Sequence, residues 1–229
     1  MDLVVARLGG HRPKELFGSI DGFENADWVF PQERIIIEHK QIETNYTDTP
    51  RFRRALQTVN ARYAQAGLLQ PFKAAPDDYL KSVALLYQPH LADLAKKANR
   101  QIRSTAKRLG WTDHLGVLLL SNRDFLDLSP HSITIILGDL LLRHYSEINA
   151  FIYLTNHYVE VPGSDLAHIL WSPHYHPDTP DRLQPFINEL GGAYYSVANE
   201  LIGPFDEHRE ISEPGALVGM VPIRQGRNV

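Results

Sequence analysis

Residues 26–42 read ADWVFPQERIIIEHKQI, and this stretch decides how the rest of the chain is interpreted. Its two ends, residues 26–30 and 34–42, are rich in the β-branched and aromatic residues that favour strands. Pro31, Gln32 and Glu33 between them are typical of a turn. The stretch therefore predicts a β-hairpin.

The register of this hairpin brings two acids together. A four-residue loop, residues 31–34, pairs Phe30 with Ile35, and counting back then places Asp27 opposite Glu38. Opposed residues of antiparallel strands lie roughly 5 Å apart and share a face of the sheet. Because side chains alternate along a strand, Lys40 joins Glu38 on that face and His39 points away.

Two carboxylates this close repel each other, so a positive group is expected beside them. Lys40 supplies one charge, and a divalent cation such as Mg²⁺ would supply two and accept oxygen ligands. A bound metal polarises a phosphoryl oxygen and lowers the pKa of a bound water, while a lysine orients that water or stabilises developing charge. The pattern indicates metal-assisted hydrolysis.

Residues 24–43, ENADWVFPQERIIIEHKQIE, resemble the core signature of the PD-(D/E)XK (restriction endonuclease-like) nuclease superfamily. Asp27 matches the acid that opens one strand, and Glu38-His39-Lys40 matches the Glu-x-Lys that ends the next, although Ala26 replaces the usual proline. The resemblance implies an α/β restriction-endonuclease-like core, a central mixed β-sheet flanked by helices, with a C-terminal decoration.

The same resemblance implies a Mg-dependent nuclease that hydrolyses phosphodiester bonds in nucleic acid. Asp27, Glu38 and the main-chain carbonyl of His39 would hold Mg²⁺ (or Mn²⁺), and Lys40 would position the attacking water. Many members also carry a glutamate on a first helix, for which Glu15 is the candidate and Glu24 the alternative.

A second interpretation stays open, because strand ends often carry charged residues simply where they meet solvent, and a short Glu-x-Lys match arises by chance. Asp27 and Glu38 would then only form ion pairs with Lys40. The chain would be a non-catalytic module on the same scaffold that binds nucleic acid or a protein partner.

The remaining elements follow hydrophobic periodicity and turn residues. Helices are expected at residues 50–65, 89–109, 132–144, 182–190 and 193–201, and strands at residues 115–121 and 148–155. The two strands with the helix between them predict a parallel pair. Residues 68–78 are expected to be a linker and the tail from Gly203 to be irregular. The expected domains are a nuclease-like core, residues 1–160, and an extension packed on it, residues 161–229.

Composition narrows the classes of protein. The 229 residues carry a formal net charge of −4 and no cysteine, which excludes disulfides and thiolate metal sites. No apolar stretch approaches the roughly 18 residues of a membrane span. The expectation is a soluble cytoplasmic protein without a membrane partner.

The negative net charge does not indicate a nucleic-acid-binding protein, but local groups of basic residues do. Four recur at helical spacing opposite an apolar stripe: Lys96, Arg100, Arg103 and Lys107. They could follow the phosphate backbone of a nucleic acid, and DNA is the expected kind. Arg51, Arg53 and Arg54 on the preceding helix could do the same. A solvated helix face is the competing interpretation. The chain could also form a homodimer.

Two further groups have weaker signals. His168, His174 and His176 crowd one proline-broken segment, where imidazoles could bind zinc and make a histidine-metal hydrolase, but their spacing matches no ligand motif. Asp124 and Asp127 follow a strand, where turn and cap duty explains them.

Overall fold

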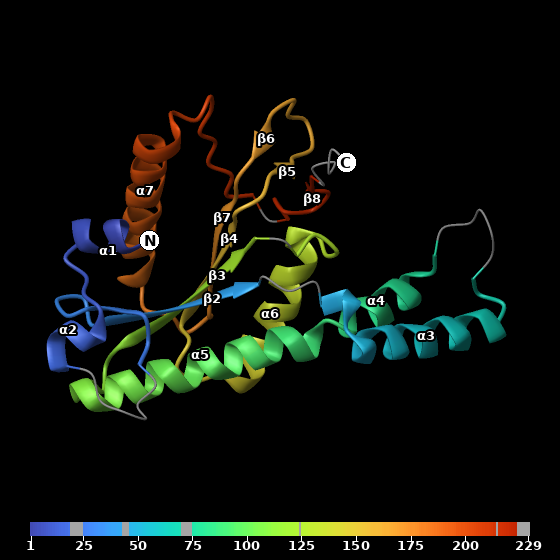
Figure 1. The fold of residues 1–229 in the computed structure, drawn as a ribbon, viewed down its shortest axis with the longest axis horizontal. Coiled ribbons are helices and arrows are strands. Elements are labelled where there is room, and N and C mark those ends of the chain that lie inside the picture. Colours follow the sequence, from blue (N-terminus) through green and yellow to red (C-terminus); the bar gives the residue numbers. More distant parts are fainter. Residues whose placement is uncertain (19–24, 43–45, 70–74, 124, 214, 224–229) are drawn as a thin grey trace.

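A mixed five-stranded sheet lies at the centre of the computed structural model, which describes residues 1–18, 25–42, 46–69, 75–123, 125–213 and 215–223. Its strand order is β1-β2-β3-β4-β7 (Figure 1). The strands are β1 (Trp28–Phe30), β2 (Ile35–Ile42), β3 (Leu115–Asn122), β4 (Ala150–Thr155) and β7 (Trp171–Tyr175). β2, β3 and β4 are parallel, and the edge strands β1 and β7 are antiparallel to their neighbours. The expected α/β class with a central mixed sheet is confirmed.

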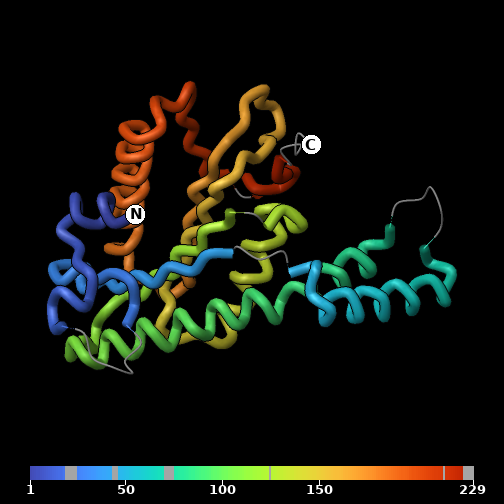
Figure 2. Tube along the Cα trace, in the orientation of Figure 1, coloured from blue at the N-terminus to red at the C-terminus, as the bar shows by residue number. Residues whose placement is uncertain are grey.

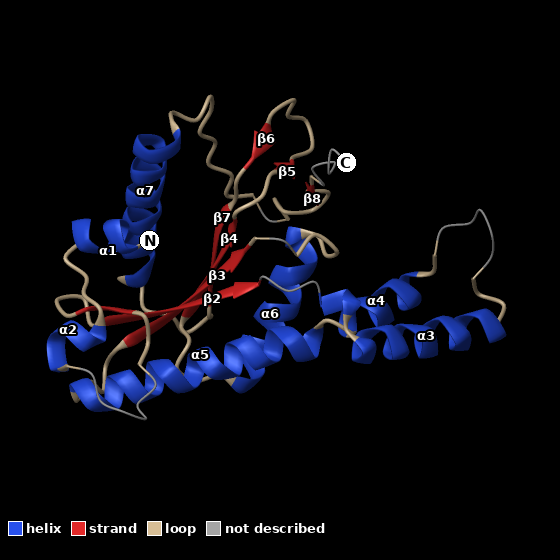
Figure 3. Cartoon of the chain, viewed as in Figure 1, coloured by secondary structure: helices blue, strands red, loops and turns tan. Residues whose placement is uncertain are grey.

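Helices cover both faces of this sheet (Figure 3). They are α1 (Asp2–Arg7), α2 (Pro13–Phe17), α3 (Pro50–Gln65), α4 (Asp77–Leu85), α5 (Gln88–Leu109), α6 (Pro130–His144) and α7 (Leu183–Ile202), with a short 3-10 helix, η1 (Tyr46–Asp48). Alternation along β2 divides the core in two. Ile36 and Ile42 pack on the side of α5 and α6, whereas Ile35 and Ile37 pack on the side of α1 and α7.

Several predicted elements are confirmed, since their end signals form as expected. Helix α3 begins after Thr49, whose hydroxyl accepts a hydrogen bond of 3.2 Å from the Phe52 amide. Helix α5 ends at Gly110, which adopts a left-handed conformation with φ of 68°. The helix expected at residues 132–144 corresponds to α6, and the parallel pairing of β3 and β4 is confirmed.

The helical character predicted for residues 182–190 and 193–201 is confirmed, but the predicted break between them was wrong, because α7 runs unbroken through Gly191 and Gly192. Gly191 serves packing instead of ending a helix. A Cβ added there would lie 2.8 Å from Nε1 of Trp171 on β7. Both β7 and α7 follow residue 160, the expected domain boundary, yet they supply one edge of the central sheet and much of one covering layer.

A second, three-stranded sheet of short strands stands at one end of β4 (Figure 1). Its order is β6-β5-β8, from β5 (Val159–Glu160), β6 (Ala167–His168) and β8 (Val221–Pro222). The C-terminal tail, expected to be irregular, therefore contributes one short strand at β8.

Helices α3 and α4 project from the body as an arm (Figure 2). The two helices hold each other through the Tyr63 and Tyr79 rings, whose centroids are 5.4 Å apart. At the base, the Phe52 ring packs 4.8 Å from that of Tyr87, next to the start of α5. Helix α4 was not expected, since its first residues were assigned to the linker. Among the described helices, none has the length and apolar character needed to cross a membrane.

Candidate metal centre on the β1–β2 hairpin

The hairpin register places Asp27 next to Glu38. Phe30 pairs with Ile35 and Trp28 with Ile37, as predicted, so Asp27 and Glu38 occupy the next positions outward, just beyond the last pair of the ladder. The Asp27 carboxylate accepts a hydrogen bond of 2.8 Å from the main-chain amide of His39. A side-chain oxygen thus occupies the place that a main-chain carbonyl of a longer β1 would fill.

The main-chain carbonyl of His39 points to the same edge of β2 as its amide. The carbonyls of Arg34 and Ile42 accept hydrogen bonds from Leu115 and Arg123, at the β3 side, so even-numbered residues of β2 pair with β3. Odd-numbered residues therefore direct both main-chain groups toward β1. Since β1 begins only at Trp28, the His39 carbonyl faces the space beside Asp27.

Glu38 is an acid buried in the sheet, with a side chain that is only 1% exposed. Burial, followed by the nearby negative charge of Asp27, raises the pKa of Glu38 to about 8, while its ion pair with Lys40 acts in the opposite direction. The Lys40 side chain is 17% exposed and donates to Oε1 of Glu38. Glu38 and Lys40 are therefore both largely shielded from water, next to the half-buried Asp27.

Helix α5 holds this site from one side through Gln101. The Lys40 ammonium donates to Oε1 of Gln101 at 2.8 Å, and Nε2 of Gln101 donates to the main-chain carbonyl of Asn25 at 2.9 Å. One turn further, the Thr105 hydroxyl accepts a hydrogen bond of 2.8 Å from the amide of Ala26. These bonds fix both Lys40 and the chain that leads into Asp27.

Two oxygen atoms of this region are buried without a hydrogen-bond partner, Oε2 of Glu38 and Oδ1 of Asn25. A buried oxygen that accepts nothing costs free energy, and a cation would remove that cost. Carboxylate and carbonyl oxygens are the donors that Mg²⁺ and Mn²⁺ take. The donor set of Glu38, Asp27 and the His39 carbonyl therefore fits a hard divalent ion.

The side chain of His39 lies on the other face of the sheet, as alternation predicted. Its Nε2 lies 2.7 Å from the Ser121 hydroxyl, and its ring stacks on Trp28 with centroids 5.9 Å apart. Burial lowers the pKa of His39. Any contribution of His39 to a metal would come from its carbonyl.

Glu15, the expected acid of a first helix, lies in α2 and caps that helix. Its carboxylate accepts a hydrogen bond of 3.2 Å from the Arg12 amide and is 53% exposed. This capping role explains Glu15 without any part in the site. Glu24, the alternative, lies outside the described residues, as does Asp124.

The predicted basic row on α5 faces solvent. Lys96, Arg100, Arg103 and Lys107 are all exposed. Arg103 contacts Glu147 at 3.1 Å, so the charge of that residue is partly compensated. Gln101, which contacts the candidate site, lies on the flank of α5 between this row and the buried stripe.

The three clustered histidines have separate local contacts. His168 lies 2.7 Å from the Ser164 hydroxyl, His174 stacks on Phe151 with centroids 4.5 Å apart, and His176 accepts from the Asp178 amide. Within the described ranges, no three His, Cys, Asp or Glu side chains gather as metal ligands. The histidine-metal alternative has no support in these contacts.

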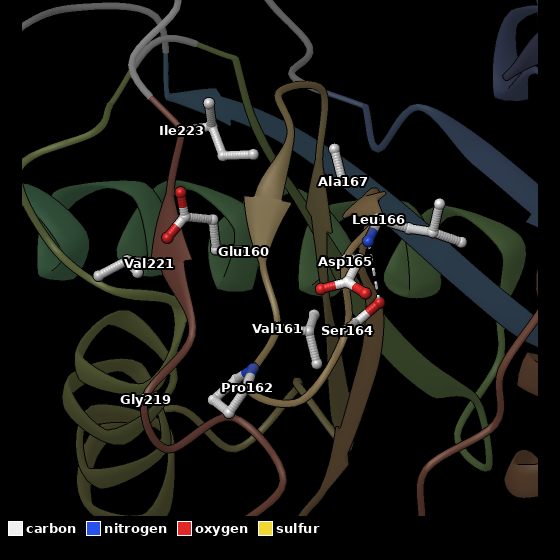
Figure 4. A pocket seen from close by; sticks show the side chains of 10 residues that line it. All are labelled: Glu160, Val161, Pro162, Ser164, Asp165, Leu166, Ala167, Gly219, Val221 and Ile223. Carbon is white, nitrogen blue, oxygen red and sulfur yellow. Dashed lines mark hydrogen bonds between the residues drawn. The ribbon is translucent and has the colours of Figure 1, made fainter.

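A surface pocket lies on the small sheet, between the β5–β6 hairpin and residues 219–223 (Figure 4). Its acidic lining residues, Glu160 and Asp165, are exposed, and both belong to the β5–β6 hairpin. None of the predicted site residues lines it.

Gln101, Asn25 and Thr105 were not predicted as parts of the site. The only sequence signal for Gln101 is its position on the flank of an amphipathic helix, which does not reveal the strand that the flank will touch. Comparison of the chain with protein-family models, curated proteins and solved structures finds no match.

Proposed function

We propose that the chain is a Mg²⁺-dependent nuclease with a restriction-endonuclease-like core, and that it hydrolyses phosphodiester bonds in nucleic acid. The observation that carries this proposal is the meeting of Asp27, Glu38 and Lys40, with Oε2 of Glu38 buried and unpartnered. Mn²⁺ would serve as well as Mg²⁺ as the bound ion. A cytoplasmic location and homodimer formation remain predictions.

Asp27, Glu38 and the His39 carbonyl would hold the ion. When bound, such an ion polarises a phosphoryl oxygen and lowers the pKa of a bound water. In the hydrolysis, the water oxygen loses a proton and forms a bond to phosphorus, one phosphorus–oxygen ester bond breaks, and the leaving oxygen takes up a proton, so that the products are a phosphate monoester and a hydroxyl group.

Lys40 would act on the attacking water or on the phosphate. An ammonium has three N–H donors, and among the described residues Lys40 gives one to Glu38 and one to Gln101. The third can be donated to the water or to the charge that develops on the phosphate oxygens. Gln101 keeps the ammonium in this position.

The exposed row of Lys96, Arg100, Arg103 and Lys107 would hold the phosphate backbone beside this site. Such contacts position a nucleic acid and carry no sequence information. They favour nucleic acid over a small phosphate ester as the substrate.

The test is cleavage of labelled DNA and RNA by the purified chain with EDTA, Mg²⁺ or Mn²⁺. Cleavage should require the metal, and Glu38→Gln should lower its rate on the order of 100-fold or more. Glu160→Gln, an exposed acid on the small sheet, is the matched control and should cleave normally. Undiminished cleavage by Glu38→Gln would rule out this site.

A non-catalytic module is the second candidate, and the Glu38–Lys40 ion pair favours it. That pair already compensates one charge without any metal. The chain would then bind nucleic acid or a protein partner without cutting. It would bind no Mn²⁺ at this site, which separates the two candidates.

A further inference from the structure

The charge of this chain is divided very unevenly between its elements. Helices α3 and α5 together contain ten Lys or Arg residues and a single acid, Asp93. The rest of the chain contains 13 Lys or Arg and 26 Asp or Glu residues. The net charge of −4 therefore hides two strongly positive helices on an otherwise acidic protein.

The cations on these two helices are also less compensated than those elsewhere. Arginines outside them commonly form ion pairs, as in Arg7–Glu200, Arg12–Asp2, Arg34–Asp113, Arg143–Asp139 and Arg209–Glu207. On α3 and α5, five exposed side chains form no hydrogen bond or ion pair with any described residue: Arg51, Arg54, Lys96, Lys97 and Lys107. Repulsion among them would be relieved by an external polyanion.

The two helices meet at their N-terminal ends and run apart from there. Phe52 at the start of α3 packs on Tyr87, the residue before α5, and Tyr46 stacks on His90 with centroids 5.0 Å apart. Figure 1 shows α5 and then α3 following the long dimension of the molecule. At 1.5 Å per residue, 22 residues of α5 span about 33 Å and 16 of α3 about 24 Å.

The composition of this surface favours a double helix over a single strand. Single strands are usually bound by exposed aromatic rings that stack on bases. Helix α5 has no Phe, Tyr or Trp, and those of α3, Phe52 and Tyr63, are buried. The buried aromatic residues of α3 and the apolar stripe of α5 pack within the chain, so these side chains are not available to enter a lipid surface.

We propose that α3 and α5 form one continuous binding surface for the phosphate backbone of a double helix, with α5 beside the candidate metal centre and α3 extending the contact. At 3.4 Å per base pair, α5 alone matches roughly 10 base pairs, and both helices match about 17. The proposal deepens the proposed function by naming a duplex substrate, but binding itself requires neither Asp27 nor Glu38.

The experiment measures fluorescence anisotropy of labelled duplexes of about 10 and 20 base pairs in EDTA. Arg51→Gln with Arg54→Gln should weaken binding of the longer duplex roughly 10-fold and reduce the salt slope by about two. Binding of the shorter duplex should change little. Arg143→Gln with Arg209→Gln removes the same charge from elsewhere and should leave both affinities unchanged.

Duplex DNA and duplex RNA are compared as probes, since both present the same backbone chemistry, and a single strand of equal length should bind more weakly. No binding of either duplex, or equal loss in both double variants, would overturn the proposal. So would salt-dependent association of the chain with itself in place of duplex binding.

Glu38→Gln separates this proposal from the nuclease. It should bind the longer duplex as tightly as the unmodified chain. If the unmodified chain binds the duplex but does not cleave it, the duplex-binding surface is supported and the nuclease proposal is refuted. If the chain cleaves nucleic acid but the α3 substitutions do not weaken duplex binding, the nuclease proposal is supported and the duplex-binding surface is refuted.

Discussion

The carboxylate of Asp27 accepts a hydrogen bond of 2.8 Å from the main-chain amide of His39. Asp27 directly precedes Trp28, the first residue of β1 and the outermost one that pairs with β2. This bond gives Asp27 two separable roles. Its oxygen provides the last hydrogen bond between the two strands, and its negative charge adds to burial in raising the pKa of Glu38.

The two roles of Asp27 can be separated by substitution. Asp27→Asn keeps an oxygen that accepts from the His39 amide, so the free energy of unfolding should change by less than about 0.5 kcal/mol. Asp27→Ala leaves that amide unpaired and should cost roughly 1–2 kcal/mol. Urea unfolding of both variants measures this. Equal loss of stability in the two would contradict the assigned hydrogen bond.

Glu38 should make the stability of the metal-free protein fall as the pH rises. Its pKa is about 8 in the folded protein against 4.5 ordinarily, so between these values the folded state holds a proton that the unfolded chain releases. The stabilisation is complete below pH 4.5 and is lost as the pH passes 8.

Glu38→Gln lacks this titration, so its stability relative to the unmodified protein should increase from pH 5 to pH 9. The change should be on the order of 2–4 kcal/mol, measured by urea unfolding in EDTA. Glu160→Gln, whose carboxylate is exposed, should show no such trend. A constant difference across this range for Glu38→Gln would contradict the raised pKa.

Gln101 should position Lys40 without binding the metal. Gln101→Met keeps the shape of the side chain but removes its bonds to Lys40 and Asn25. The turnover number should fall about 10-fold, with KM and Mn²⁺ affinity nearly unchanged. Ser104→Ala on the same helix is the control. A loss of Mn²⁺ affinity equal to the loss of turnover would show a merely structural effect.

The adjacent glycines of α7 should respond in opposite ways to alanine. Gly192→Ala adds a methyl where nothing lies within 4 Å and should stabilise by about 0.5–1 kcal/mol. Gly191→Ala pushes a methyl against Trp171 and should destabilise by roughly 1–3 kcal/mol. Thermal unfolding compares the two. Stabilisation by both would mean that Trp171 does not pack as described.

The hairpin could be predicted from sequence because its information is local. The loop between Phe30 and Ile35 fixes the register, and alternation then fixes the faces of Glu38, His39 and Lys40. The environment of the site could not be predicted. The contact between Lys40 and Gln101 depends on how α5 lies across β2, about 60 residues later in the chain.

The C-terminal third was harder to predict because its local signals compete with tertiary packing. Pro173 argues against a strand, yet β7 is an edge strand, where a missing amide costs little. The pair Gly191-Gly192 suggests a helix end, yet Gly191 is explained by packing, because a side chain at this position would clash with the Trp171 ring. Both signals have their meaning only once the partner element is known.

Calorimetric titration of the purified protein with Mn²⁺ tests the central claim most directly, because it needs no knowledge of the substrate. One site per chain should be detected, and it should be lost in both Asp27→Asn and Glu38→Gln but kept in Glu160→Gln. A metal centre on the β1–β2 hairpin would be contradicted if the unmodified protein bound no Mn²⁺, or if the two site variants bound Mn²⁺ as tightly as the unmodified protein.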